Sequence, residues 1–186
     1  MWQVFTKVMP DTTDEQSRSA LTLLGMVGSI EPNLIISNVN ILVEHGLDSG
    51  NMKIVHDTCL ALSKIANNLS KGSGPEVAPM RFDQDHELFV KLEKIILESV
   101  GNKNDDQFIP MSQQAITVIY SLSDCPDDLA AKICRNLAEK LVERPKSVLL
   151  LRRVFFVVGH MAACQVRDVV SVSRRKFQRF QISCFQ

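Results

Sequence analysis

The chain has 186 residues, of which 45% are hydrophobic and 6% aromatic, and its 21 basic residues balance 21 acidic ones. This length and apolar content suffice to bury the core of one domain. Basic residues concentrate after position 166, which leaves 16 basic and 20 acidic residues in 1–166. A mildly acidic body of this kind argues against a strong phosphate-binding surface.

The five cysteines are odd in number and contain no C-x-x-C pair, which indicates reduced thiols in a cytosolic or nuclear compartment. The first residues lack the apolar run of a signal peptide. The longest apolar region, 148–158, is interrupted by two arginines and is too short to span a bilayer. We therefore expect a soluble, intracellular protein without a membrane segment.

Helix start and stop signals follow one another along the chain. A short helix is expected over 2–9, and Thr13 to Gln16 have the pattern of a capping box that begins the next one. Pro32 is expected to open a further helix and Gly46 to end it. Later helices are predicted over 52–69, from Asp83 or Asp85 to about 101, from Pro110, from Pro126 to about 142, and over about 147–165. Two glycines and two prolines in 71–79 predict a loop.

One apolar helical phrase occurs four times, beginning at Ala20, Cys59, Ala115 and Val154. The starting positions are separated by 39, 56 and 39 residues, and the predicted loop lies inside the longer interval. A period near 40 with two helices per period is typical of an α-solenoid. The sequence thus predicts an all-α fold, an α-solenoid of about four HEAT-like antiparallel helix pairs, in which each copy of the phrase is the second helix of its pair.

Candidate catalytic and metal-binding residues are weakly supported. His56 with Cys59 and His160 with Cys164 could each share a helix face, but a structural zinc site needs four ligands and no others have suitable spacing. In 71–74 the order Lys-Gly-Ser-Gly is the reverse of a phosphate-binding loop, where the lysine follows the last glycine. We predict no catalytic, cofactor-binding or metal-binding residues, no cofactor and no enzymatic activity.

Two adjacent arginines, Arg152 and Arg153, interrupt the apolar segment that contains the fourth copy. Extension of both side chains to the solvent edge, with or without ion pairing, is one interpretation. Contact with a partner or with phosphate is the other, and it makes these two residues the candidate partner-contact site.

Several phrases in the same order resemble the family of the HEAT-repeat subunit 1 of condensin. They are Ser19–Met26, Glu31-Pro32, Ser37–Val39, His86–Phe89, Pro110 with Gln114–Ile116, Ile119–Leu122 and, most specifically, Arg153–Ala162. The resemblance covers about 5–166. It implies that 1–166 is a HEAT-repeat segment of a larger subunit, and we expect 167–186 to be a basic, disordered tail that does not match the family.

The resemblance also implies a function. A member of this family is a non-catalytic scaffold that binds the kleisin subunit and, through it, the SMC ATPase heterodimer, and supports DNA engagement in mitotic chromosome condensation. We accordingly expect chromatin contact through the complex, no membrane or small-molecule substrate, and localisation in the nucleus and on chromosomes, with a cytoplasmic pool left open. The alternatives are another HEAT or armadillo module, of the nuclear transport receptor or adaptor type, and an enzyme built on one of the His/Cys pairs.

Overall fold

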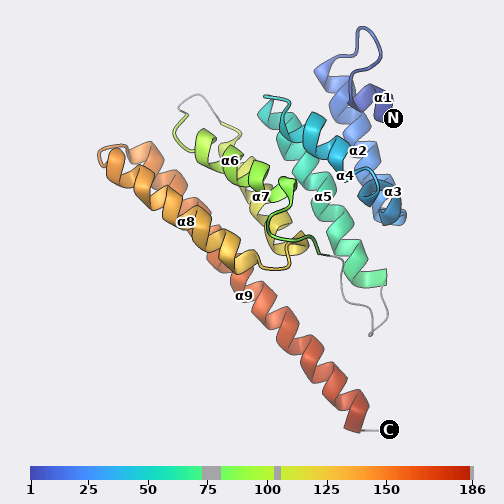
Figure 1. The fold of residues 1–186 in the computed structure, drawn as a ribbon, viewed down its shortest axis with the longest axis vertical. Helices are drawn as coiled ribbons and strands as arrows, with labels where there is room; N and C mark the ends of the chain where they lie inside the picture. The colour runs from blue at the N-terminus through green and yellow to red at the C-terminus, as the bar shows by residue number, and fades with distance from the viewer. Residues whose placement is uncertain (73–80, 103–105, 185–186) are drawn as a thin grey trace.

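The computed structural model describes residues 1–72, 81–102 and 106–184, and at 65–72 and 171–184 it describes the backbone alone. Its elements are helices throughout (Figure 1). In chain order they are α1 (Trp2–Phe5), α2 (Asp14–Ile30), α3 (Pro32–Ile36), α4 (Val39–Ile41), the π-helical η1 (Leu42–Leu47), α5 (Met52–Gly72), α6 (Glu87–Ser99), α7 (Phe108–Leu122), α8 (Pro126–Glu143) and α9 (Val148–Cys184). The all-α prediction is confirmed.

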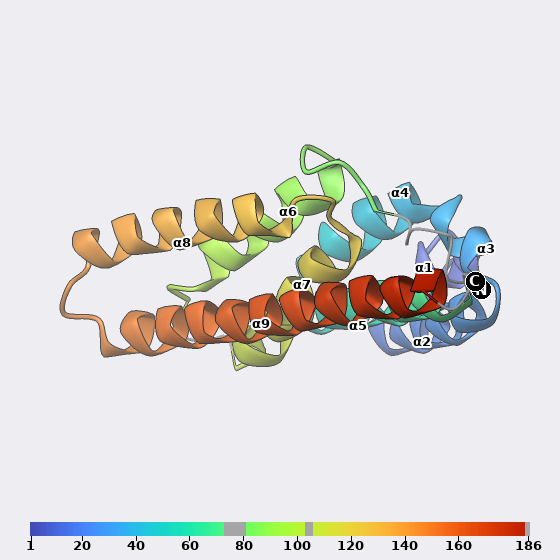
Figure 2. The ribbon, with the colours of Figure 1, turned by 90° about the horizontal axis from the view of Figure 1, so that it is seen from below.

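The helices form two layers, which are seen edge-on in Figure 2. One layer contains α2, α5, α7 and α9, and each of these helices packs against the next. The other contains α4, α6 and α8. The four copies of the apolar phrase lie in α2, α5, α7 and α9, so the predicted solenoid of helix pairs is confirmed, with each copy on the second helix of its pair.

The core runs between the two layers and along the row of phrase-bearing helices. In α7, Ala115 and Ile116 are fully buried, and on α6 Phe89 and Leu92 face the same core. Because α7 lies between α5 and α9, side chains around nearly its whole circumference are buried. Each helix pair thus depends on its neighbours for the burial of its apolar surface.

The helix predicted from Pro32 to Gly46 is divided into α3, α4 and η1. Pro32 does occupy the first turn of α3, as expected. The helix is interrupted where Ser37 Oγ donates to the carbonyl of Asn33 and Asn38 Nδ2 donates to that of Leu34, each at 2.8 Å. Such side-chain bonds to the backbone compete with the regular helical pattern, which explains the break.

Of the two helix N-terminal caps predicted from the sequence, the one of α2 is present and the one of α6 is formed by a different residue. The capping box is confirmed, because Thr13 Oγ1 accepts from the Gln16 amide at 3.3 Å and Gln16 Oε1 accepts from the Thr13 amide at 2.9 Å. The prediction of Asp83 or Asp85 as the cap of α6 is wrong. His86 caps this helix through Nδ1, which accepts from the Leu88 amide at 3.2 Å, while the Asp83 carboxylate accepts from the Asp85 amide in the preceding turn.

The last helix continues to Cys184, beyond the end predicted near residue 165. No glycine or proline occurs in 166–184 to stop it. Asp168 lies 3.5 Å from Arg81 Nη2, an ion pair that joins this part of α9 to the segment before α6. The assignment of 167–186 as a tail outside the repeats stays a prediction. Most of the predicted loop over 71–79 lies outside the described residues.

Gly46 is needed for packing rather than for ending a helix. A Cβ at this position would lie 2.7 Å from Cγ2 and 3.1 Å from Cβ of Thr58. Thr58 is fully buried, and its hydroxyl donates to the Ile54 carbonyl at 2.8 Å, so it has little freedom to move. This close approach joins η1 to α5.

We predict that Gly46→Ala lowers the free energy of unfolding by about 1–2 kcal/mol, because the added methyl group overpacks the contact with Thr58. Urea unfolding followed by circular dichroism measures this. Gly159→Ala is the matched control, since a Cβ there meets nothing within 4 Å, and it should leave stability unchanged or raise it by up to about 1 kcal/mol. Equal effects of the two substitutions would contradict the packing role.

Candidate partner-binding surfaces

The two candidate arginines have different environments on α9. Arg153 is 5% exposed, whereas its neighbour Arg152 lies on the solvent side of the helix. Successive residues of an α-helix point about 100° apart, so one of the pair enters the core while the other leaves it. A partner contact therefore stays a prediction for Arg152, whereas the side chain of Arg153 is buried inside the fold.

Arg153 closes the C-terminal end of α6. Its Nη1 donates to three carbonyls, those of Ser99 at 3.2 Å, Val100 at 3.3 Å and Asn102 at 2.6 Å. The guanidinium carbon also lies 4.8 Å from the centroid of the Phe108 ring, at the start of α7. Cationic side chains stabilise the free carbonyls at a helix C-terminus, and the ring adds a cation–π contact. The sequence showed an arginine in an apolar helix but gave no sign of these acceptors.

The side of α9 that bears Arg152 is otherwise apolar and exposed. Leu151 is 41% exposed, Phe155 68%, Val158 40% and Val166 63%. Their spacing places them along one face of the helix. We call Arg152, Phe155, Val158 and Gly159 the open face of α9.

Because α9 is apolar on both sides, part of it has the composition of a membrane span. The segment Val148–Val170 is long and apolar enough to cross a membrane by length and composition alone, with a mean hydropathy of 1.4 in its best window. This segment is longer than the apolar region 148–158 from which the sequence predicted that no membrane segment is present. A third of the window, 33%, is buried inside the fold, and a core helix can meet the same criterion.

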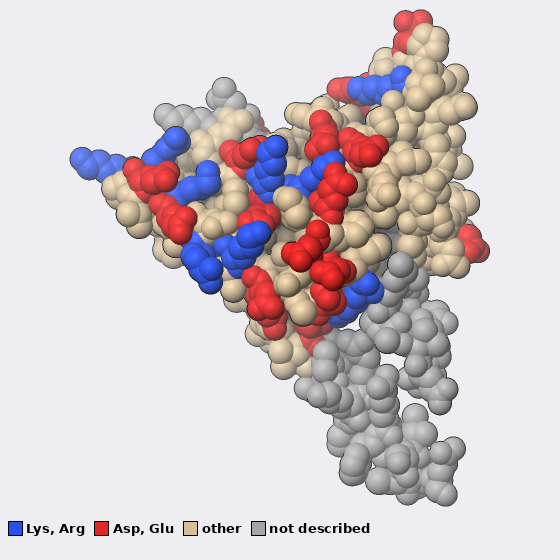
Figure 3. All heavy atoms as spheres, in the orientation of Figure 1, with Lys and Arg blue, Asp and Glu red and all other residues tan. Residues whose placement is uncertain are grey.

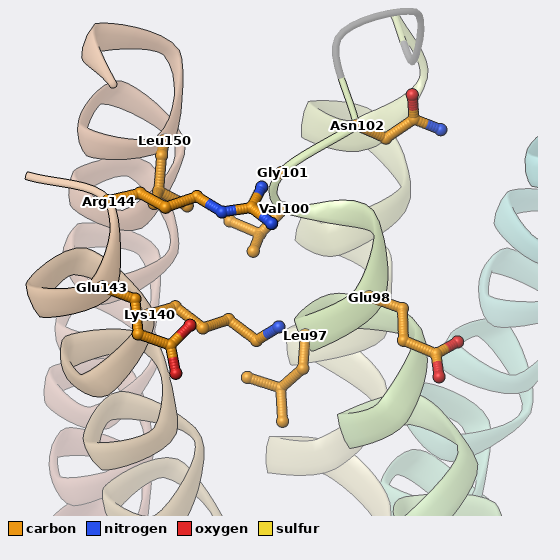
Figure 4. A pocket seen from close by; sticks show the side chains of 9 residues that line it. All are labelled: Leu97, Glu98, Val100, Gly101, Asn102, Lys140, Glu143, Arg144 and Leu150. Atoms are coloured by element: carbon orange, nitrogen blue, oxygen red, sulfur yellow. The ribbon is translucent and has the colours of Figure 1, made fainter. Parts of the chain in front are cut away.

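A cleft of about 260 Å³ lies where the C-terminal ends of α6 and α8 meet (Figure 4). Lys140 and Arg144 extend from the α8 side toward Leu97, Val100 and Gly101, and Glu98 points away from them. Its size is slightly below the range usual for small-molecule sites, and its lining is rich in charged side chains. The described residues that line the cleft include no Ser, Thr, Cys or His side chain.

The His/Cys pairs do not have the features of a nucleophilic site. Burial raises the pKa of Cys59 to about 12, and His56 interacts through Nδ1 with Asp57 at 2.9 Å. Burial also raises the pKa of Cys164 and lowers that of His160, whose Nε2 lies 3.7 Å from the Cys164 sulfur. A reactive cysteine requires a lowered pKa, so these shifts oppose catalysis.

Metal ligation finds no support in the described part of the chain. No three His, Cys, Asp or Glu side chains gather there in an arrangement that could hold a metal ion.

Charges of both signs alternate over α6 and α8 on the face shown in Figure 3, and the surface over α1 to α3 carries few charges. Several of these charges pair with one another. Lys91 contacts Asp48 at 2.7 Å and Glu87 at 2.9 Å, and Lys132 contacts Glu93 at 2.8 Å. This face therefore lacks the single-sign field that steers nucleic acid to a protein.

The chain is similar to several curated proteins, although no protein-family model matches it. It is 29% identical over 147 residues to condensin complex subunit 1 of Mus musculus, an alignment that covers 77% of this chain and 10% of the relative. The corresponding protein of Xenopus laevis is 25% identical over 177 residues, with 89% of this chain and 13% of the relative covered. That of Homo sapiens is 29% identical over 129 residues, with 68% and 9% covered. The chain thus spans about a tenth of the length of these relatives.

Replacement of Arg153 by Met is expected to lower the free energy of unfolding by about 2–4 kcal/mol, because it removes a buried charged donor from the carbonyls of Val100 and Asn102 and also removes the cation–π contact. Arg152→Met is the matched control and should change stability by less than about 0.5 kcal/mol. Urea unfolding of the two variants gives the comparison. Equal stabilities would show that the carbonyl cluster does not depend on Arg153.

Thiol labelling tests the enzymatic alternative. In variants that retain one cysteine each, we expect iodoacetamide at pH 8 to modify the exposed Cys125 at least about a hundredfold faster than Cys59 or Cys164, because burial hides both and keeps them protonated. Mass spectrometry follows the labelling. Rapid modification of Cys164 in the folded protein would revive the enzymatic alternative.

Proposed function

Since this chain is related to a segment of condensin complex subunit 1, we propose that it acts as a non-catalytic HEAT-repeat scaffold of the condensin complex. In this role it binds the kleisin subunit, connects through it to the SMC ATPases, and supports DNA engagement in mitotic chromosome condensation. The observation that carries the proposal is the similarity to these subunits over most of a chain that folds as stacked helix pairs.

The architecture supports a scaffold role. Stacked helix pairs present a continuous surface on which an extended peptide can lie, and an extended segment of a kleisin suits such a surface. The raised thiol pKa values and the mixed charges of the cleft favour binding over chemistry. ATP hydrolysis then falls to the SMC partners.

DNA engagement is proposed to occur through the assembled complex. Over α6 and α8, basic side chains are interspersed with acidic ones and several are paired, which weakens their attraction for phosphate. The proposed location is the nucleus and chromosomes. We assign 1–166 as the HEAT-repeat segment and 167–186 as a basic extension outside it.

The test is affinity purification of the tagged natural full-length product from dividing cells, with its partners identified by mass spectrometry. We expect kleisin and both SMC subunits to be recovered together in comparable amounts. Recovery of a small GTPase or transport cargo without SMC subunits would overturn the proposal in favour of a transport receptor or adaptor.

A core variant tests whether the association needs the folded repeats, and a surface variant is its matched control. Ile116→Asp places a charge at a fully buried position of α7 and should abolish the recovery of kleisin, whereas the exposed Arg135→Glu on α8 should not. Equal recovery with both variants would show that the association does not depend on the folded repeats.

A further inference from the structure

Two of the phrase-bearing helices share an arginine and a glycine at the same spacing. In α2, Arg18 precedes Gly25 by seven residues, and in α9, Arg152 precedes Gly159 by seven. In each helix the arginine stands two residues before the start of the apolar phrase, at Ala20 or Val154. A separation of seven places both residues on one face of a helix, two turns apart. The open face of α9 therefore repeats a face that α2 also has.

The α2 face shows what this pattern does. Arg18 Nε donates to Asp57 Oδ2 on α5 at 2.7 Å. Gly25 allows α5 to approach so closely that a Cβ on it would lie 3.1 Å from the Cβ of Ala61. On α2 the arginine thus pairs with an acidic residue of the neighbouring helix. The glycine packs against a small residue that follows this acidic residue by four positions on the same helix.

On α9 no helix lies against the same positions in the part of the chain that the structure describes. A Cβ added at Gly159 would meet nothing within 4 Å, and among the described residues no acidic side chain forms an ion pair with Arg152. Phe155 is 68% exposed and Val158 is 40% exposed, whereas Leu21 and Leu24, at the matching positions of α2, are 0% and 2% exposed. The face has the chemistry of a helix contact without its partner.

We propose that the open face of α9 is a docking site for an amphipathic helix that runs parallel to α9 and carries an acidic residue followed four positions later by alanine. The acidic side chain pairs with Arg152, and the alanine packs against Gly159, as Asp57 and Ala61 of α5 do on α2. Phe155 and Val158 supply the apolar area between them. This inference rests on the internal repeat and is independent of the proposed function.

A second copy of this chain fits the face less well. The first two phrases are 39 residues apart, so Arg18 of α2 occupies the position in its repeat that Asp57 occupies in α5. Head-to-tail stacking would therefore bring Arg18 of the second copy to Arg152, and like charges oppose that arrangement. Charge complementarity selects an acidic helix.

The test uses a helix-stabilised synthetic peptide with the sequence of residues 52–69 of this chain, which contains the Asp57 and Ala61 pattern. Binding to the whole 186-residue chain is measured by fluorescence anisotropy with a labelled peptide. We expect saturable binding to the wild-type chain. Arg152→Glu should weaken it about tenfold, since an attractive pair becomes a repulsive one, and a peptide with Asp57→Arg should restore binding to that variant. Gly159→Leu should weaken binding more than about tenfold by occupying the space of the alanine.

Arg135→Glu, which changes the same charge on the exposed side of α8, is the matched control and should bind as the wild type does. Circular dichroism verifies that each variant folds. The proposal is overturned if the wild-type chain does not bind the peptide or if the charge exchange fails to restore binding. It is also overturned if the open face is instead covered by another occupant. Sedimentation showing self-association lost in Gly159→Leu would identify a second copy, and Arg152-dependent binding to phosphatidylserine vesicles would identify a lipid surface.

Discussion

The fold depends on one packing constraint: each helix in the row of α2, α5, α7 and α9 is apolar on opposite sides and needs a neighbour on each. In the interior of the row this is met: Ile116 and Val118 of α7 point to roughly opposite sides of the helix, and both are buried because α7 lies between α5 and α9. At α9 it is met on one side. Val154 and Val157 are buried, while Phe155 and Val158, one residue further on in each case, are exposed. The hydropathy of α9 follows directly from this two-sided apolar pattern.

The sequence predicts the row of helices because burial imposes a periodicity that survives in the residues themselves. Helix ends are predicted where the deciding contact is local, as at the capping box of Thr13 and Gln16. They are missed where several local bonds compete. Ser37 and Asn38 divide one predicted helix, and His86 replaces the aspartates as a cap, because the choice among nearby donors and acceptors depends on the backbone path that packing sets.

The different environments of Arg152 and Arg153 could not be predicted from the sequence, for a related reason. Both arginines interrupt the same apolar helix, and only the position of α6 decides which one meets carbonyl oxygens. The acceptors, at Ser99, Val100 and Asn102, are about fifty residues away and are backbone atoms, so no side-chain pattern marks them. Polar contacts between a side chain and a distant backbone leave no periodic signal, in contrast to the apolar contacts that the repeat records.

Apolar faces of similar size can pack against one another in many combinations, so they hold a solenoid together without deciding which helix follows which. Polar pairs and close approaches supply that choice. Between α2 and α5 the choice rests on Arg18 with Asp57 and on Gly25 with Ala61, contacts that a different helix would replace with an unpaired charge or a steric clash. The retention of both the arginine and the glycine on α9 therefore gives its open face selectivity as well as apolar area, since Arg152 disfavours a basic helix and Gly159 favours a small residue at the point of closest contact.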